Sequence, residues 1–154
     1  MDVYPDFEEF LKLLRDNKVE FLVIGGYAVA YHSRPKYTKD IDIWIKNSKT
    51  NAVKLIKTLQ QFGLNHSKFA VADFLSEFTV VQVGYPPVRI DIMTGLEGLN
   101  FKDAYQNRVY GKYGSIENVP YISYDDLIKN KELTGREYDE QDIKWLRKYK
   151  KKSK

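Results

Sequence analysis

Two aspartates lie two positions apart in an otherwise apolar stretch, residues 40–45, which reads DIDIWI. Alternate side chains of a strand share a face, so Asp40, Asp42 and Trp44 point one way while the three isoleucines point toward the core. Two adjacent carboxylates repel each other. The pattern therefore indicates either a pair of ligands for a cation or the solvent-facing side of a sheet edge.

A third acid, Asp91, lies in the middle of a second apolar stretch, residues 88–93 (VRIDIM). If the two stretches form neighbouring strands, the three carboxylates converge. Oxygen ligands without His or Cys suit Mg²⁺ or Mn²⁺ better than Zn²⁺. The alternative is that Asp91 faces outward from an ordinary hairpin or forms an ion pair with Arg89.

A glycine pair, Gly25-Gly26, follows the apolar residues 19–24 and precedes a predicted short helix over residues 27–33. Such a turn lets a phosphate approach backbone N–H groups at a helix N-terminus. Phosphoryl and nucleotidyl transfer rely mainly on positioning and on cations, so glycines and three acids suffice in principle. A tight turn without a ligand is the alternative. The chain has no G-x-G-x-x-G after this strand and no G-x-x-x-x-G-K-[ST], so neither a dinucleotide-binding fold nor a P-loop NTPase is supported.

Several basic and polar side chains flank these motifs. Arg34 and Lys36 precede the acids, and Lys131 lies on a predicted helix near the end of the chain. Each is a candidate to neutralise phosphate charge, although a solvated basic loop explains Arg34 and Lys36 equally well. Thr38 is expected to brace the entry of the strand, and His32 to make a structural hydrogen bond.

The elements that must position these residues follow from the hydrophobic periodicity. One α/β domain with a mixed sheet is expected. Near the end of the chain, Asp139 is explained as a helix cap and Asp142 as a partner of Arg136. Helices are predicted over residues 7–14, 27–33, 52–59, 125–133 and 139–149, with a further short one possible in 66–75; strands are predicted over 19–24, 40–45, 78–83 and 88–93, with an edge strand in 109–122.

The order and spacing of these motifs resemble a known superfamily. Gly25-Gly26, thirteen intervening residues and then Asp40-Ile41-Asp42-Ile43 are similar to the signature of the DNA polymerase β-like nucleotidyltransferases. Residues 32–45 (HSRPKYTKDIDIWI) most resemble the small bacterial members grouped with abortive-infection toxins and minimal nucleotidyltransferase antitoxins. Near the C-terminus, Lys131 with Gly135-Arg136 and an Asp-x-x-Asp pair is also similar to these relatives, so the resemblance spans residues 19–146.

The resemblance implies a nucleotidyltransferase fold and a site for a nucleoside triphosphate. Gly25 and Gly26 would hold the triphosphate; Asp40, Asp42 and Asp91 would bind Mg²⁺ or Mn²⁺, and Asp91 would help to activate an acceptor hydroxyl. The superfamily often has Ser where this chain has Gly26. Relatives act on proteins or on tRNA ends, often beside a cognate toxin or antitoxin or in phage defence. The alternative is a catalytically silent module that binds nucleotide, RNA or a partner protein.

Composition sets the remaining bounds. The 154 residues contain no cysteine, which excludes disulfides and thiolate sites, and no apolar run approaches the ~20 residues of a membrane helix. The acidic N-terminus does not resemble a secretory signal, so a cytoplasmic protein without a membrane partner is expected. Residues 144–154 hold seven of the 25 basic residues and no acidic one, which leaves 18 basic and 21 acidic residues and a net charge of −3 in the remainder. We therefore expect a single domain over residues 1–148 and a basic, flexible tail over 149–154.

Overall fold

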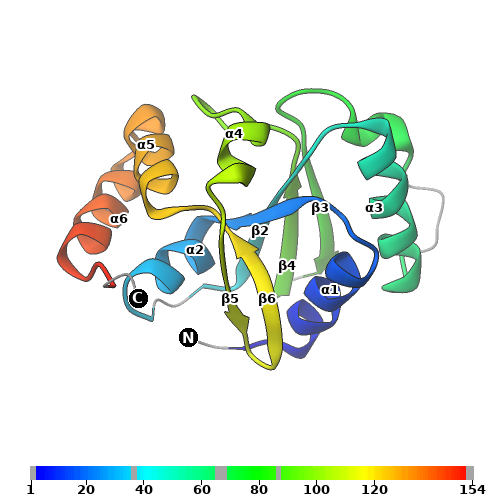
Figure 1. The fold of residues 1–154 in the computed structure, drawn as a ribbon, viewed down its shortest axis with the longest axis horizontal. Helices are drawn as coiled ribbons and strands as arrows, with labels where there is room; N and C mark the ends of the chain where they lie inside the picture. The colour runs from blue at the N-terminus through cyan, green and yellow to red at the C-terminus, as the bar shows by residue number, and fades with distance from the viewer. Residues whose placement is uncertain (1–2, 36–37, 65–68, 86–87, 152–154) are drawn as a thin grey trace.

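The computed structural model describes residues 3–35, 38–64, 69–85 and 88–151. Its centre is a six-stranded mixed sheet, and in Figure 1 helices α1 and α3 lie on one side of it and α5 and α6 on the other. The order of the strands is β3-β4-β2-β1-β6-β5. Their bounds are β1 (Phe21–Ile24), β2 (Asp40–Ile45), β3 (Val80–Tyr85), β4 (Val88–Met93), β5 (Val109–Tyr113) and β6 (Ile116–Tyr121).

Strand β2 runs between β1 and β4 and fixes the relation of the sequence motifs. It is antiparallel to β1 and parallel to β4, with Asp42 opposite Asp91 and Asp40 opposite Arg89. The predicted strands 40–45 and 88–93 are thus confirmed as neighbours. Because β1 leads directly into α2 (Gly25–His32), the glycine pair lies at the same end of the sheet as the acids.

The core forms where the apolar periodicity predicts it. Helix α1 (Pro5–Asp16) buries Phe7, Phe10, Leu11 and Leu14 and starts with a proline and acidic residues in its first turn. Helix α3 (Lys49–Gln61) is capped by Ser48, whose side chain accepts a hydrogen bond from the backbone N–H of Asn51. The isoleucines of β2 are buried, so the acids lie on the opposite face.

Two parts of the sheet and helix pattern differ from the prediction. Residues 109–122 form a hairpin of two strands rather than one edge strand, because the chain turns at Gly114 (φ +57°), and β6 pairs in parallel with β1. Helix α4 (Phe101–Gln106) was not predicted, since its six residues are too few to show a period. In the region 66–75 only a 3-10 turn, Val71–Phe74, lies among the described residues, and 65–68 lie outside them.

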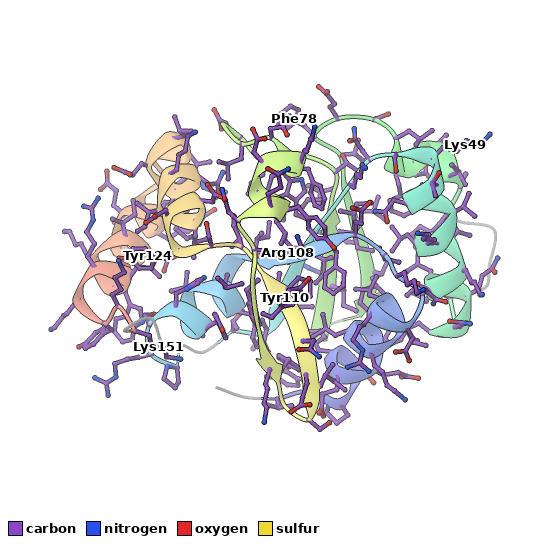
Figure 2. All side chains as sticks on the ribbon, in the orientation of Figure 1. Lys49, Phe78, Arg108, Tyr110, Tyr124 and Lys151 are labelled. Carbon is purple, nitrogen blue, oxygen red and sulfur yellow. The ribbon has the colours of Figure 1, made fainter. Side chains whose placement is uncertain are left out.

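The chain ends in two helices, α5 (Tyr124–Thr134) and α6 (Glu137–Lys148), joined at Gly135 in the left-handed conformation (φ +59°). The last described residues lie against the domain: the N–H of Lys151 donates to the carbonyl of His32, and Lys150 lies over the ring of Tyr124. Lys151 and Tyr124 are labelled in Figure 2. The predicted flexible tail falls partly on 152–154, outside the described residues. No described helix has the length and apolar character needed to cross a membrane.

Candidate active site

A pocket of about 410 Å³ opens over the ends of β2 and β4 beside the glycine turn. It brings together residues that are far apart in the sequence, from β1–α2, β2, β4 and the α5–α6 corner. Six of the eight predicted site residues line it: Gly25, Gly26, Asp40, Asp42, Asp91 and Lys131. The glycines and the three carboxylates therefore lie in one pocket, as the sequence predicted.

The glycine turn lies directly against the acids. Gly25 is the first residue of α2 and has a left-handed backbone (φ +67°), and a Cβ atom there would collide with the carboxylate of Asp42. A Cβ atom at Gly26 would lie 3.1 Å from Oγ1 of Thr38. This side chain occupies the space that a serine at position 26 would need, and Thr38 also braces β2, as predicted, by donating to the carbonyl of Asp40 at 3.0 Å.

Negative charge is concentrated around Asp42. Burial, followed by the nearby Asp91 and Asp40, raises the pKa of Asp42 from 3.8 to about 7. The positive charges of Lys131 and Arg89 act in the opposite direction but do not cancel the effect. A cation bound between these carboxylates would relieve the repulsion.

Arg89 is a site residue that the sequence analysis considered only as an ion-pair partner of Asp91. Its Nε donates to Oδ1 of Asp91 at 3.0 Å, and its Nη2 donates to Oδ2 of Asp91 at 3.2 Å and to Oδ2 of Asp40 at 3.1 Å. One guanidinium therefore joins the acids of two strands. The signal in the sequence was its alternation with Asp91, which places both side chains on one face of β4.

The donor set fits Mg²⁺ or Mn²⁺ in part. Within the described ranges, no cluster of three or more His, Cys, Asp and Glu side chains is arranged to hold a metal ion, and Arg89 engages Asp40 and Asp91 as described. Asp42 and Asp91 nevertheless face each other across adjacent strands. Mg²⁺ is commonly held by one or two carboxylates, with water and substrate phosphates as the other ligands. The carboxylates of Asp42 and Asp91, which lie next to the glycine turn, meet that requirement.

Lys131 lies at the back of the pocket within a buried ionic network. Its Nζ donates to Oδ2 of Asp142 at 2.9 Å and to Oδ1 of Asp139 at 3.4 Å. Asp142 was predicted to pair with Arg136; it accepts this hydrogen bond from Lys131, and its charge also contributes to raising the pKa of Arg136. Asp139 caps α6 as predicted, accepting from the backbone N–H and the Nε of Arg136 at 3.3 and 2.7 Å. Burial alone would raise the pKa of Asp139, but hydrogen bonds from Arg136 and Thr134 lower it to about 2.

Of the two basic residues predicted ahead of the acids, one is described and does not line the pocket. Arg34 lies 4.8 Å from the ring centroid of Tyr149 and does not line the pocket. Lys36 lies outside the described residues. His32 has the structural role expected of it, since its Nε2 lies 2.6 Å from the carbonyl oxygen of Ile122.

The pocket also contains residues that the sequence reasoning did not propose for it. Tyr138 lines it beside Arg136, whose guanidinium lies 4.5 Å from the centroid of that ring. Met93 lies on the opposite side, one step beyond Asp91 on the same face of β4. A recognisable signal existed only for Arg136, in the Gly135-Arg136 segment. The position of Tyr138 depends on how α6 folds back against α5.

Residues 4–154 match the family described as "Nucleotidyl transferase of unknown function (DUF2204)". The chain belongs to this family. It is therefore an enzyme of the nucleotidyltransferase class, as the resemblance of the Gly-Gly and Asp-x-Asp motifs implied. No curated protein matches the chain.

Solved structures agree with this assignment at the level of the fold. This nucleotidyltransferase is similar to a protein of Thermotoga maritima assigned as a nucleotidyltransferase (TM1012), with a TM-score of 0.60, 18% identity and coverage of 96% of each chain. It is also similar to the lincosamide antibiotic adenylyltransferase LnuA in its lincomycin-bound form, with a TM-score of 0.53, 18% identity and coverage of 96% and 98%. A third is ANT(2")-Ia in complex with adenylyl-2"-tobramycin, with a TM-score of 0.57, 12% identity and coverage of 91% and 84%. At these identities the similarity establishes the nucleotidyltransferase fold.

Proposed function

We propose that this nucleotidyltransferase moves a nucleoside monophosphate from a Mg²⁺-bound nucleoside triphosphate, ATP being the first candidate, to a hydroxyl group of an acceptor. The observation that carries the proposal is the register of β2 and β4, in which Asp42 lies opposite Asp91 while the turn at Gly25 packs against Asp42. Nucleotidyl transfer requires phosphates and carboxylate-bound cations within one pocket. The turn at Gly25, which would hold the phosphates, and Asp42 and Asp91, which would bind the cation, line the same pocket.

The triphosphate is proposed to lie over the glycine turn. The first backbone N–H groups of a helix have no partner within it, and Gly25 and Gly26, the first residues of α2, line the pocket, so this turn suits phosphate oxygens. Lys131 and Arg136 line the same pocket and add positive charge on the opposite side. The predicted phosphate contacts of Arg34 and Lys36 remain predictions.

The reaction forms a bond between the acceptor oxygen and the α-phosphorus and breaks the bond from this phosphorus to the pyrophosphate oxygen. Pyrophosphate leaves with the electron pair of that bond, and the hydroxyl proton passes to a carboxylate. Asp91 is the proposed proton acceptor, with Asp40, Asp42 and Asp91 as the proposed metal ligands. Bound Mg²⁺ would neutralise phosphate charge and orient the attacking and leaving oxygens. Arg89 would have to release Asp40 and Asp91 for all three acids to act together.

Three classes of acceptor are candidates for the transferred nucleotide. A protein or a tRNA end remains a candidate, as does a role beside a cognate toxin or antitoxin or in phage defence, because the motifs resemble those of such enzymes. LnuA is an antibiotic adenylyltransferase, and the ANT(2")-Ia complex contains an adenylylated tobramycin. Those proteins make a small-molecule acceptor a third candidate.

The test is transfer from an α-labelled nucleoside triphosphate, with Mg²⁺, to acceptors in protein, RNA and small-molecule fractions of a cell extract. Asp42→Asn and Asp91→Asn should each lower the rate by about 100- to 1000-fold, because each removes a charge that balances the cations at the reacting phosphate. Asp103→Asn, at an exposed acid on α4, is the matched control and should leave the rate unchanged. Equal transfer by the wild type and Asp42→Asn would contradict the proposal.

One observation favours a second candidate, a silent binding module. Arg89 already forms ion pairs with Asp40 and Asp91 and balances part of their charge, as an internal cation would in a site that no longer uses metal. Such a module would bind a nucleoside triphosphate without releasing pyrophosphate in any extract fraction. Calorimetric titration with ATP and Mg²⁺, combined with a pyrophosphate assay, separates the two candidates.

A further inference from the structure

Tyrosine rings and cationic side chains meet on a surface that lies apart from the active-site pocket. This surface, here called the basic tyrosine surface, consists of three tyrosines and three cations: Tyr31, Tyr110, Tyr124, Arg108, Lys150 and Lys151. The six residues come from the end of α2, the start of β5, the first turn of α5 and the last described part of the chain. Four of them are labelled in Figure 2. None of the six lines the pocket at the glycine turn.

Contacts between these residues make the surface continuous from β5 to α5. The hydroxyl of Tyr31 donates to the carbonyl oxygen of Tyr110 at 3.1 Å. The Nζ of Lys151 lies 5.7 Å from the centroid of the Tyr31 ring. The adjacent Lys150 places its Nζ 4.4 Å from the centroid of the Tyr124 ring. Rings and positive charges therefore alternate along the surface.

The rings of Tyr31 and Tyr110 are held in place by the fold. Tyr31 stacks on the buried ring of Tyr121, with 4.1 Å between the centroids and 9° between the planes. Gly111 provides the space for the Tyr31 ring, because a Cβ atom there would collide with it. Tyr110 is 53% exposed, and its hydroxyl accepts from the Nε of Arg108 at 2.6 Å. Rings that are already ordered lose little side-chain entropy when a planar group stacks on them.

The cations of the surface are not paired with acids. Among the described residues, Arg108, Lys150 and Lys151 form no ion pair with a carboxylate. Lys112, also on β5, does form one, with Glu117 at 3.4 Å. Cations that are held close together repel each other, and a bound polyanion would relieve this repulsion.

The neighbouring charges indicate the direction in which a polyanion would run. Two acids, Asp125 and Asp126, lie beside the surface in the first turn of α5. Toward the chain end the positive charge continues, since Arg34 and Lys148 lie 4.8 and 5.2 Å from the centroid of the Tyr149 ring. A bound polyanion is therefore expected to follow the chain end and to avoid α5.

We propose that the basic tyrosine surface binds a single-stranded nucleic acid, with phosphates against the cations and bases against the tyrosine rings. Proteins that bind single strands combine positive charge along the phosphate backbone with aromatic rings on which bases stack. An acidic protein segment would meet the cations but has no bases to stack on the rings, so it fits the surface less well. The proposal goes beyond the proposed function, because it requires neither the pocket nor nucleotidyl transfer.

Binding is measured by fluorescence anisotropy of the full chain with a labelled oligo(U) of about 12 nucleotides, a length within the usual site size. We expect saturable binding with a Kd at or below about 100 µM. An RNA duplex of the same length should bind at least about 10-fold more weakly, because paired bases are already stacked on each other, and so should a polyglutamate peptide. Absence of saturable binding, or equal binding of the duplex or the peptide, would overturn the proposal.

The double variant Lys150→Gln/Lys151→Gln tests the cations. For a single strand, the slope of log K against log salt concentration changes by about 0.7 for each phosphate contact, so the slope should become shallower by about 1.4. Lys49→Gln/Lys57→Gln, at two exposed lysines on α3, changes the net charge equally and should leave the slope unchanged. Equal changes of slope in the two double variants would show that only net charge matters and would overturn the surface.

Tyr110→Leu tests the stacking of bases. The variant keeps an apolar side chain but removes the ring, so the affinity for oligo(U) should fall by about 10-fold while the salt slope stays the same. Phe78→Leu, at a 64% exposed ring outside the surface, is the matched control and should bind like the wild type. Urea unfolding checks that each variant is folded. Wild-type affinity of a folded Tyr110→Leu variant would overturn the proposal.

The kind of strand is tested with oligo(dU) of the same length. Tighter binding of oligo(U) assigns RNA as the ligand, and tighter binding of oligo(dU) assigns DNA. The lysine and tyrosine variants should weaken both strands alike, because neither the phosphate nor the stacking contact involves the 2′-hydroxyl. A variant that weakened only one of the strands would contradict this arrangement. These titrations contain no nucleoside triphosphate, so a failure of nucleotidyl transfer and a failure of the surface give different results.

Discussion

Arg89 and Asp91 are joined by two hydrogen bonds, from Nε to Oδ1 at 3.0 Å and from Nη2 to Oδ2 at 3.2 Å. This fork places a fixed positive charge on one of the proposed metal ligands, and the same Nη2 also reaches Asp40. Asp91 raises the pKa of Arg89 through this hydrogen bond and its charge. The guanidinium therefore competes with any cation that approaches the two acids.

Replacing Arg89 by Gln should strengthen the binding of Mn²⁺ to the nucleotide-free protein by roughly fivefold, because the carboxylates lose their internal counter-charge. The measurement is calorimetric or paramagnetic titration with Mn²⁺ at low ionic strength. Arg147→Gln, at an exposed arginine of α6 that pairs with Glu132 of α5 and does not line the pocket, is the matched control. Weaker binding in the Arg89 variant would mean that Arg89 supports the metal site instead of competing for it.

Gly25 should not tolerate alanine, because a Cβ atom there would collide with Asp42 in addition to straining the backbone. Gly25 and Gly63 both have positive φ values, +67° and +99°, but only at Gly25 would a Cβ atom collide with Asp42. We expect Gly63→Ala to lower the free energy of unfolding by about 1 kcal/mol through strain, and Gly25→Ala to lower it by about 3 kcal/mol. Urea unfolding measures both. Equal losses of unfolding free energy in the two variants would show that a Cβ atom at Gly25 does not collide with Asp42.

The capping network at Asp139 should make stability depend on acidic pH. Its folded pKa of about 2 lies below the ordinary value of 3.8, so the group stabilises the fold above pH 4 and loses this contribution as the pH falls toward 2. The shift corresponds to about 2 kcal/mol at neutral pH. Asp139→Asn should therefore lose stability relative to the wild type at pH 6, and the difference should shrink between pH 4 and 2.

Urea unfolding across this pH range gives the comparison. Asp16→Asn, at a half-exposed acid that forms an ion pair with Arg15, should show a small difference that barely changes with pH. A difference between wild type and Asp139→Asn that stays constant down to the lowest accessible pH would contradict the low pKa of Asp139.

The sequence predicts the acidic face of the site well, because the positions of Asp40, Asp42 and Asp91 depend on the local alternation of each strand. The alternation of DIDIWI puts Asp42 on the face opposite the isoleucines, and β2 begins and ends at the predicted residues. The convergence with Asp91 needed one further assumption, that the two strands are neighbours. The parallel pairing of β6 with β1 was not predictable in this way, since nothing in its weak alternation identifies its partner.

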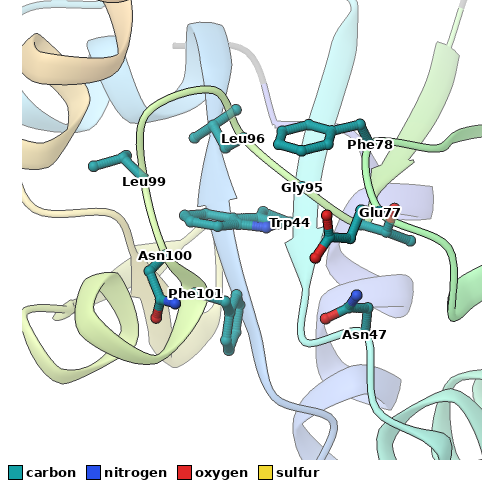
Figure 3. A pocket seen from close by; sticks show the side chains of 10 residues that line it. Trp44, Asn47, Glu77, Phe78, Gly95, Leu96, Leu99, Asn100 and Phe101 are labelled. Atoms are coloured by element: carbon teal, nitrogen blue, oxygen red, sulfur yellow. The ribbon is translucent and has the colours of Figure 1, made fainter.

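The rest of the site depends on contacts between elements that are distant along the chain. Lys131 was identified, but its pairing with Asp142 depends on the angle at Gly135 between α5 and α6. A smaller pocket lined by Trp44 (Figure 3) depends on loops around Phe78 and Leu96 that have no periodic signal. The alternation of β2 predicts only that Trp44 lies on the face of the acids.

The closeness of Thr38 to Gly26 disfavours a serine at position 26, where the superfamily often has one, and it yields a double-mutant prediction. Gly26→Ser introduces a Cβ atom 3.1 Å from Oγ1 and 3.3 Å from Cβ of Thr38, which should cost about 1–2 kcal/mol. Thr38→Ala removes Oγ1 and its bond to the Asp40 carbonyl, which should cost about 1 kcal/mol. In the double variant the crowding at Oγ1 is absent, so its loss of stability should be smaller than the sum of the two single losses by at least about 0.5 kcal/mol. Urea unfolding of the four proteins measures this coupling, and strictly additive losses would show that Thr38 does not determine the residue at position 26.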